Sequence, residues 1–106
     1  MKSYINLARK AGLIIFGLDN VKRLLKKDQV GLIICSPDLG KSALRETDFI
    51  KKKHLTVEVY MTSKPETLRE MVNKDNVKFI GIKRSNMLVK ISSLAKTLWS
   101  PDGKEV

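Results

Sequence analysis

The residues best placed to do chemistry in this chain are four basic side chains that recur at the spacing of one helical turn. Arg23 and Lys27 are four positions apart, as are Lys22 and Lys26, so the four share the solvent face of an expected helix. Gly17 directly precedes that helix. The first N–H groups of a helix attract phosphate, and cations one turn later reach neighbouring phosphates or base edges. The pattern indicates either a nucleic-acid contact or a solvated helix face without a ligand.

No constellation typical of an active site or a metal site accompanies these cations. The sequence has no phosphate-binding loop, no dinucleotide-binding glycine motif and no nucleophile elbow. The one histidine, His54, follows three lysines at the expected end of a helix, where the helix dipole favours a cation. The one cysteine, Cys35, lies in an apolar run and is expected in the core. We therefore expect a non-catalytic protein without a metal or a cofactor.

The charge balance favours a polyanionic partner. Lysine and arginine total 21 against 11 aspartate and glutamate residues, a formal net charge of +10 over 106 residues. Such an excess on a small domain creates a field that attracts nucleic acid or an anionic membrane surface. Aromatic residues make up only 6% of the chain, too few for the stacking platforms of most single-strand binders. The expected partner is therefore a structured RNA.

The apolar residues fall in short runs, none of which approaches the roughly 20 residues that a membrane span needs. The N-terminus is mixed in polarity and lacks the apolar stretch and the cleavage site of a signal peptide. These features predict a soluble, cytoplasmic protein without membrane contact.

Short apolar runs alternate with amphipathic segments along the chain, as expected for strands that alternate with helices. Serines at 3, 63 and 85 are expected to cap helices. The expected helices cover 4–11, 17–27 and 41–53, with two more beginning near 63 and 85. The expected strands lie at 13–16, 32–35, 56–60 and 77–82.

This alternation predicts the fold class. Strands separated by helices of about ten residues imply crossover connections and helices on both faces of a sheet. We therefore expect an α/β protein, a three-layer α-β-α sandwich with a central sheet of about four strands. The length predicts a single domain, which we place at residues 1–100, followed by a short flexible tail at 101–106.

The N-terminal segment resembles the ribosomal L-seven-Ae kink-turn family, in particular its small bacterial YlxQ-type members. These proteins open with a Leu-Ala-x-x-Ala-Gly helix, a short apolar stretch and a glycine, which fall here at residues 7–12, 13–16 and 17. The likeness continues through the later elements and covers roughly residues 3–98. The resemblance implies an α-β-α sandwich that binds RNA with a sharp internal bend, such as a kink-turn.

The resemblance also implies where the RNA contacts lie. The family signature Gly-x-Asn-Glu-x-x-Lys falls on Gly17, Asp19, Asn20 and Arg23, which keep the glycine and a cation but reverse the order of amide and carboxylate. A second family contact is the loop before the last strand, here residues 74–77. The expected RNA-binding residues are Gly17, Asp19, Asn20, Arg23, Lys26, Lys27, Lys74 and Asn76.

Two other classes of function stay open from the residues alone. In the first, the chain is a protein-interaction module whose charge serves solubility. In the second, it is a small enzyme or the RNA-recognition part of an RNA-modifying enzyme. The expected partner remains structured RNA, such as ribosomal RNA, with association with the ribosome; the sequence predicts no oligomeric state.

Overall fold

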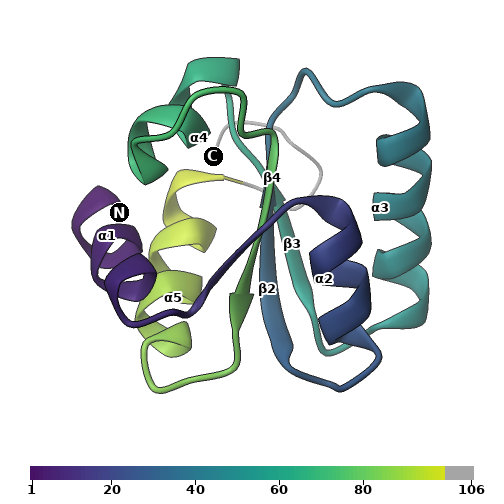
Figure 1. Cartoon of the computed structure of the whole chain (residues 1–106), viewed down its shortest axis with the longest axis horizontal. Coiled ribbons are helices and arrows are strands. Elements are labelled where there is room, and N and C mark those ends of the chain that lie inside the picture. Colours follow the sequence, from purple (N-terminus) through teal and green to yellow (C-terminus); the bar gives the residue numbers. More distant parts are fainter. Residues whose placement is uncertain (100–106) are drawn as a thin grey trace.

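The computed structural model describes residues 1–99, in which five helices surround one sheet of four strands (Figure 1). The helices are α1 (Lys2–Lys10), α2 (Leu18–Leu25), α3 (Lys41–Lys53), α4 (Pro65–Val72) and α5 (Leu88–Leu98). The strands are β1 (Ile14–Phe16), β2 (Val30–Cys35), β3 (Glu58–Met61) and β4 (Phe79–Lys83). The tail expected at 101–106 and the last position of the expected domain, 100, lie outside the described residues.

The strands pair in the order β1-β4-β2-β3. β4 runs antiparallel to both of its neighbours, while β2 and β3 run parallel to each other. As a result, the carboxyl ends of β1, β2 and β3 lie at the same edge of the sheet as the amino end of β4. The turn from β1 to α2 and the loop from α4 to β4 therefore meet at this edge.

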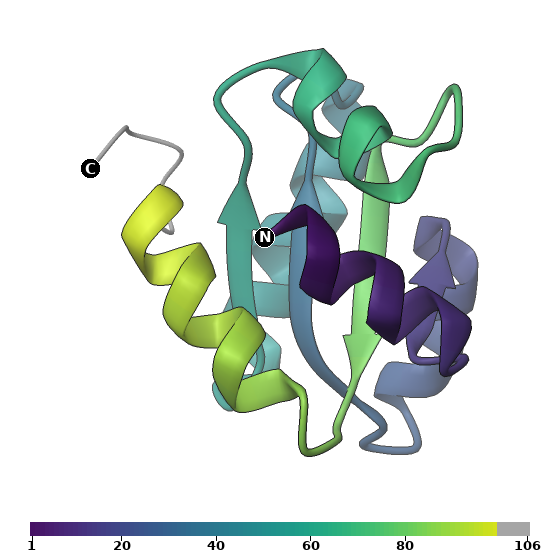
Figure 2. The same cartoon turned by 90° about the vertical axis from the view of Figure 1, so that its left-hand side faces the viewer.

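Both faces of the sheet are covered, and the central strand β2 is buried along its whole length. Leu32 and Ile34 face the layer of α1, α4 and α5, whereas Ile33 and Cys35 face α2 and α3. Figure 2 shows α1, α4 and α5 lying across one face of the strands. The side chains of β2 alternate between the two cores because successive residues of a strand point to opposite faces. The three-layer α-β-α sandwich predicted from the sequence is confirmed.

A close contact between α2 and β4 sets the position of that helix. A Cβ atom placed on Gly81 would lie 2.9 Å from Cγ2 of Val21, which is fully buried. Glycine at this position of the strand therefore allows the helix to lie directly against the backbone of β4.

The helices begin at residues other than the expected serines. Ser3 lies inside α1, whose N-cap is Met1, and α5 has Met87 rather than Ser85 as its N-cap. The cap expected at Ser63 is also wrong, since no side chain caps α4. Local capping signals were overridden because the buried apolar face of a helix contributes more stability than one capping bond.

Within residues 1–99, no helix combines the length and the apolar character that crossing a membrane requires.

Candidate nucleic-acid interface

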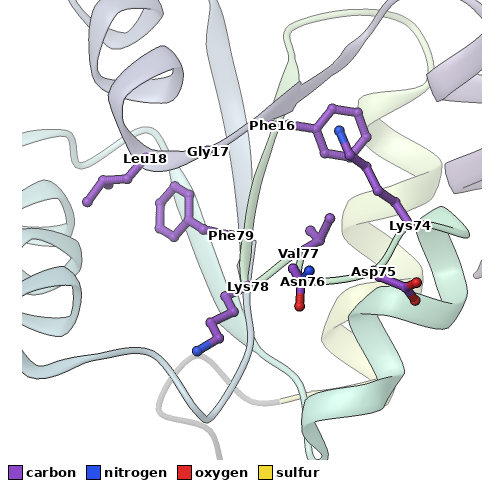
Figure 3. A pocket seen from close by; sticks show the side chains of 9 residues that line it. All are labelled: Phe16, Gly17, Leu18, Lys74, Asp75, Asn76, Val77, Lys78 and Phe79. Atoms are coloured by element: carbon purple, nitrogen blue, oxygen red, sulfur yellow. The ribbon is translucent and has the colours of Figure 1, made fainter.

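A cleft of about 480 Å³ opens at the sheet edge where the β1–α2 turn meets the α4–β4 loop (Figure 3). We call it the loop cleft. The structure thus brings Gly17 together with Lys74 and Asn76, which are far apart in the sequence. The cleft is lined by Phe16, Gly17, Leu18, Lys74, Asp75, Asn76, Val77, Lys78 and Phe79.

The β1–α2 turn depends on the conformation of Gly17. Its φ of +87° and ψ of 146° lie in a region that side-chain-bearing residues rarely adopt. The Gly17 N–H donates a 3.2 Å hydrogen bond to the carbonyl of Phe79, which ties the turn to β4. This bond places the start of α2 against the loop cleft.

The first turn of α2 is open to solvent. Gly17 is the N-cap and has no side chain to satisfy the first N–H groups, which have no carbonyl partners within the helix. Asn20 donates from Nδ2 to the carbonyl of Phe16 at 2.9 Å, and Arg23 donates to Oδ1 of Asn20 at 3.4 Å. The Asp19 side chain is exposed in the same turn. The backbone N–H groups of this turn and the Arg23 guanidinium can therefore bind an anion. The Asp19 carboxylate can accept a hydrogen bond from a ligand.

The α4–β4 loop forms the second wall of the cleft. Asn73 ends α4 with φ of 51°, and Asn76 has φ of 63°, both left-handed conformations that asparagine tolerates better than most residues. Lys74, Asn76 and their neighbour Asp75 are exposed. The loop consequently presents one ammonium group, one amide and one carboxylate at the cleft.

Phe16 and Arg9 belong to the site but were not among the residues predicted from the sequence. The Lys74 ammonium lies 4.4 Å from the centroid of the Phe16 ring, and the Arg9 guanidinium carbon lies 5.4 Å from it. In Figure 3 the Lys74 side chain reaches over the ring of Phe16. One feature of the sequence could have identified Phe16. It is an aromatic residue directly before Gly17, at the end of a strand, where the following turn brings the chain to the surface.

An ionic cluster fixes the α4–β4 loop relative to β2. Asp38 accepts hydrogen bonds from the Ser36 hydroxyl and, at 2.8 Å, from Arg69, and Lys78 Nζ lies 3.9 Å from the same carboxylate. The Ser36 hydrogen bond has the largest effect and, together with the bond and the charge of Arg69, holds the pKa of Asp38 below its ordinary value against desolvation, which raises it. The cluster partly neutralises Lys78 and Arg69, leaving Lys74 as the freer cation of the loop.

Lys26 and Lys27 do not lie at the loop cleft. α2 has eight residues and so is about 12 Å long, which puts both lysines beyond its far end, near the opposite edge of the sheet. Lys22 forms an ion pair with Glu46 at 3.1 Å on α3. Arg23 lies one turn before Lys27 and does not line the loop cleft, but its guanidinium bonds Asn20, so of the four cations it is the one joined to the first turn of α2.

The remaining groups singled out by their chemistry have structural roles. Cys35 is buried, its thiol donates to the carbonyl of Tyr60 at 3.3 Å, and burial raises its pKa to about 11. His54 is the C-cap of α3. Among residues 1–99, no three His, Cys, Asp or Glu side chains are grouped closely enough to hold a metal ion.

Comparison with known proteins shows the fold and no more. One similar solved structure is that of a protein with unknown function from Bacillus halodurans C, with a TM-score of 0.74 and 23% sequence identity. The match covers 90% of this chain and 95% of that chain. No protein-family model and no curated protein matches the sequence.

Proposed function

We propose that this chain is a non-catalytic RNA-binding protein of the kink-turn-binding type, with the loop cleft as the centre of its RNA surface. The observation that carries the proposal is the meeting of two exposed segments from opposite ends of the chain at one sheet edge. The first turn of α2 supplies free backbone donors, and the α4–β4 loop supplies Lys74 and Asn76.

The chemistry of the cleft suits a folded RNA. Phosphates fit the open N–H groups after Gly17 and the cations Arg23 and Lys74, because backbone donors and side-chain cations both hold phosphate oxygens. The Asp19 carboxylate and the Asn76 amide are exposed beside them and can read the edges of unpaired bases. A bend in the RNA would allow its backbone and its bases to reach both walls of the cleft.

The long-range field acts in the same direction. A net charge of +10 draws a polyanion to the whole surface, and Lys26 and Lys27 at the far edge add to this attraction. In this proposal the two lysines contribute to general electrostatic attraction, whereas the residues of the loop cleft recognise the shape of the RNA. Ribosomal RNA is one structured RNA that would meet these requirements.

The test is a titration of a kink-turn RNA and a plain RNA duplex of equal length, each at several salt concentrations. Neutralisation of about four phosphates predicts a slope of log affinity against log salt of roughly −3 to −4. The proposal predicts tighter binding of the kink-turn RNA at every salt concentration. Equal affinities for the two RNAs would refute shape recognition, and a slope near zero would refute RNA binding.

A protein-interaction module is the second candidate, and two exposed apolar side chains on and just beyond α3 favour it. Phe49 is 62% exposed on α3, and Leu55 directly beyond the helix is 85% exposed. Large apolar side chains that are this exposed can mark a protein contact. A pulldown with and without ribonuclease separates the two candidates, because a directly bound protein survives the nuclease and an RNA-bridged one does not. Loss of that protein in a Phe49→Ser variant would support the module.

A further inference from the structure

We infer that the loop cleft receives one unpaired nucleotide, whose base stacks on the ring of Phe16 while its phosphate is bound by Lys74 and Arg9. The inference rests on the proposed function and specifies the ligand of one part of the RNA surface. It assigns a role to two residues, Phe16 and Arg9, that neither the basic helix pattern nor the family signature includes.

The first observation is that two cations converge on one aromatic ring. The Lys74 ammonium and the Arg9 guanidinium lie 4.4 Å and 5.4 Å from the centroid of Phe16. Within residues 1–99, neither cation forms an ion pair with a carboxylate. Two like charges held near one ring repel each other, and an anion placed between them removes that repulsion. The group is therefore suited to a phosphate.

The second observation is that the two cations are held differently. Arg9 donates a hydrogen bond to the carbonyl of Val72, the last residue of α4, which fixes its guanidinium beside the ring. Lys74 lies in the exposed loop after Asn73 and rests on the ring through its flexible side chain. A base can therefore displace the Lys74 ammonium from the ring face, while Arg9 stays in place. The displaced ammonium is then free to pair with the phosphate of the same nucleotide.

The third observation is the space on either side of this group. Phe16 and Lys74 line the loop cleft of about 480 Å³, and Arg9 lines a second hollow of about 460 Å³ with Asn6, Lys10 and Asn73. Both volumes fall in the range of about 300–1,000 Å³ that is typical of sites for small organic ligands. The exposed amides of Asn73 and Asn76 lie on the two sides and can bond the edge of the base.

A single stacking ring is consistent with the low aromatic content of the chain. Proteins that bind long single strands need several aromatic rings, and only 6% of this chain is aromatic. One ring at the edge of a folded-RNA surface serves one nucleotide that the RNA fold has already left unpaired. The simpler alternative is that Lys74 only shields the Phe16 ring from water.

Photocrosslinking distinguishes stacking from shielding. Each unpaired position of a kink-turn RNA is replaced in turn by 5-iodouridine, the complex with the full chain is irradiated, and the crosslinked peptide is identified by mass spectrometry. Stacking predicts that one position crosslinks to Phe16. Phe16→Leu should abolish this crosslink and weaken binding about 5- to 100-fold, and Phe16→Tyr should restore both.

A second variant separates the phosphate contact from the base contact. Lys74→Ala should reduce the steepness of the salt slope by about 0.7 to 0.9 and keep the crosslink to Phe16. Phe16→Leu should abolish the crosslink and keep the salt slope, since it removes the ring and no charge. Lys74 is exposed, so its replacement tests the inference even if Phe16→Leu proves unfolded by circular dichroism.

The outcomes separate this inference from the proposal on which it rests. Tight binding of the kink-turn RNA without a crosslink to Phe16 from any position overturns the stacking inference and leaves the proposed function standing. Unchanged affinity in a folded Phe16→Leu variant does the same. Failure of the natural chain to bind the kink-turn RNA overturns both.

Discussion

Arg69 and Asp38 form an ion pair in which Nη2 lies 2.8 Å from Oδ2, and this pair joins α4 to the segment that follows β2. Lys78, in the α4–β4 loop, lies on the same carboxylate at 3.9 Å. One acidic side chain thus connects the second wall of the loop cleft to the central strand. Removal of that carboxylate should loosen the wall without disturbing either apolar core.

The stability that Asp38 contributes should depend on pH in the acid range. Its folded-state pKa is lowered, so the contribution is complete above about pH 4 and is lost as the pH falls through the lowered value. Asp38→Asn should therefore lower the free energy of unfolding at pH 7, and the difference from the natural chain should shrink at about pH 3. Urea denaturation of both chains at the two pH values measures this difference in the free energy of unfolding.

Asp75→Asn is the matched control for this experiment. Asp75 is exposed in the α4–β4 loop and forms no ion pair within residues 1–99. Its replacement should leave the denaturation midpoint almost unchanged at both pH values. A difference between Asp38→Asn and the natural chain that is equally large at both pH values would contradict the role given to the ion pair.

Tyr60→Phe should lower the free energy of unfolding by about 1 kcal/mol, because it removes a hydrogen bond to Glu58. The Tyr60 hydroxyl and the Ser92 hydroxyl each donate to the Glu58 carboxylate at 2.6 Å, and Tyr60 is almost completely buried. Burial, together with the neighbouring Glu58, raises the pKa of Tyr60, so its hydroxyl keeps its proton in the folded chain. The stability lost in Tyr60→Phe should therefore be constant from neutral pH to about pH 10. Chemical denaturation measures the loss, and Tyr4→Phe on α1 serves as the control. Equal stabilities of the Tyr60→Phe variant and the natural chain would show that the bond contributes nothing.

Gly17→Ala should cost about 1–3 kcal/mol of folding free energy, because alanine is strained at φ of +87° even where space is open. Gly40→Ala is the control, since Gly40 is also a helix N-cap in open space but has φ of −64°. Thermal unfolding of the two variants gives the comparison. A loss at Gly40 as large as that at Gly17 would exclude backbone strain as the cause.

Gly81→Ala should destabilise the chain by about 1–3 kcal/mol through overpacking against α2. The added Cβ would lie 2.9 Å from Val21, so the same substitution should cost less in a Val21→Ala background. A double-mutant cycle measured by urea denaturation tests this coupling. Strictly additive effects would mean that the two residues do not restrain each other.

The fold class could be predicted because the apolar residues of each helix or strand recur at the spacing of that element. The same residues form the two cores. The strand order could not be predicted, since β4 enters between β1 and β2 through contacts between segments far apart in the chain. For the same reason, helical spacing correctly assigned Arg23 and Lys27 to the solvent face but could not show that the Arg23 side chain bonds Asn20 in the first turn of α2 while Lys27 lies beyond the end of the helix.

The cluster around Phe16 was beyond the reach of sequence patterns. Its three members come from α1, from β1 and from the α4–β4 loop, and no local spacing relates them. By contrast, the meeting of Gly17 with residues 74–77 was implied by the family resemblance, which pointed to both segments as RNA contacts.

The most direct test of RNA binding at the loop cleft compares two double variants of equal charge. Arg23→Ala/Lys74→Ala removes an exposed cation bonded to the first turn of α2 and an exposed cation that lines the cleft. Lys52→Ala/Lys90→Ala removes two exposed cations near the opposite edge of the sheet. Affinity for the kink-turn RNA is measured for both across a salt series. Our account predicts that the salt slope of the first pair is less steep by about 1.4 to 1.8 and that of the second is almost unchanged. A larger loss in the Lys52→Ala/Lys90→Ala variant would place the RNA at the other edge and contradict the account.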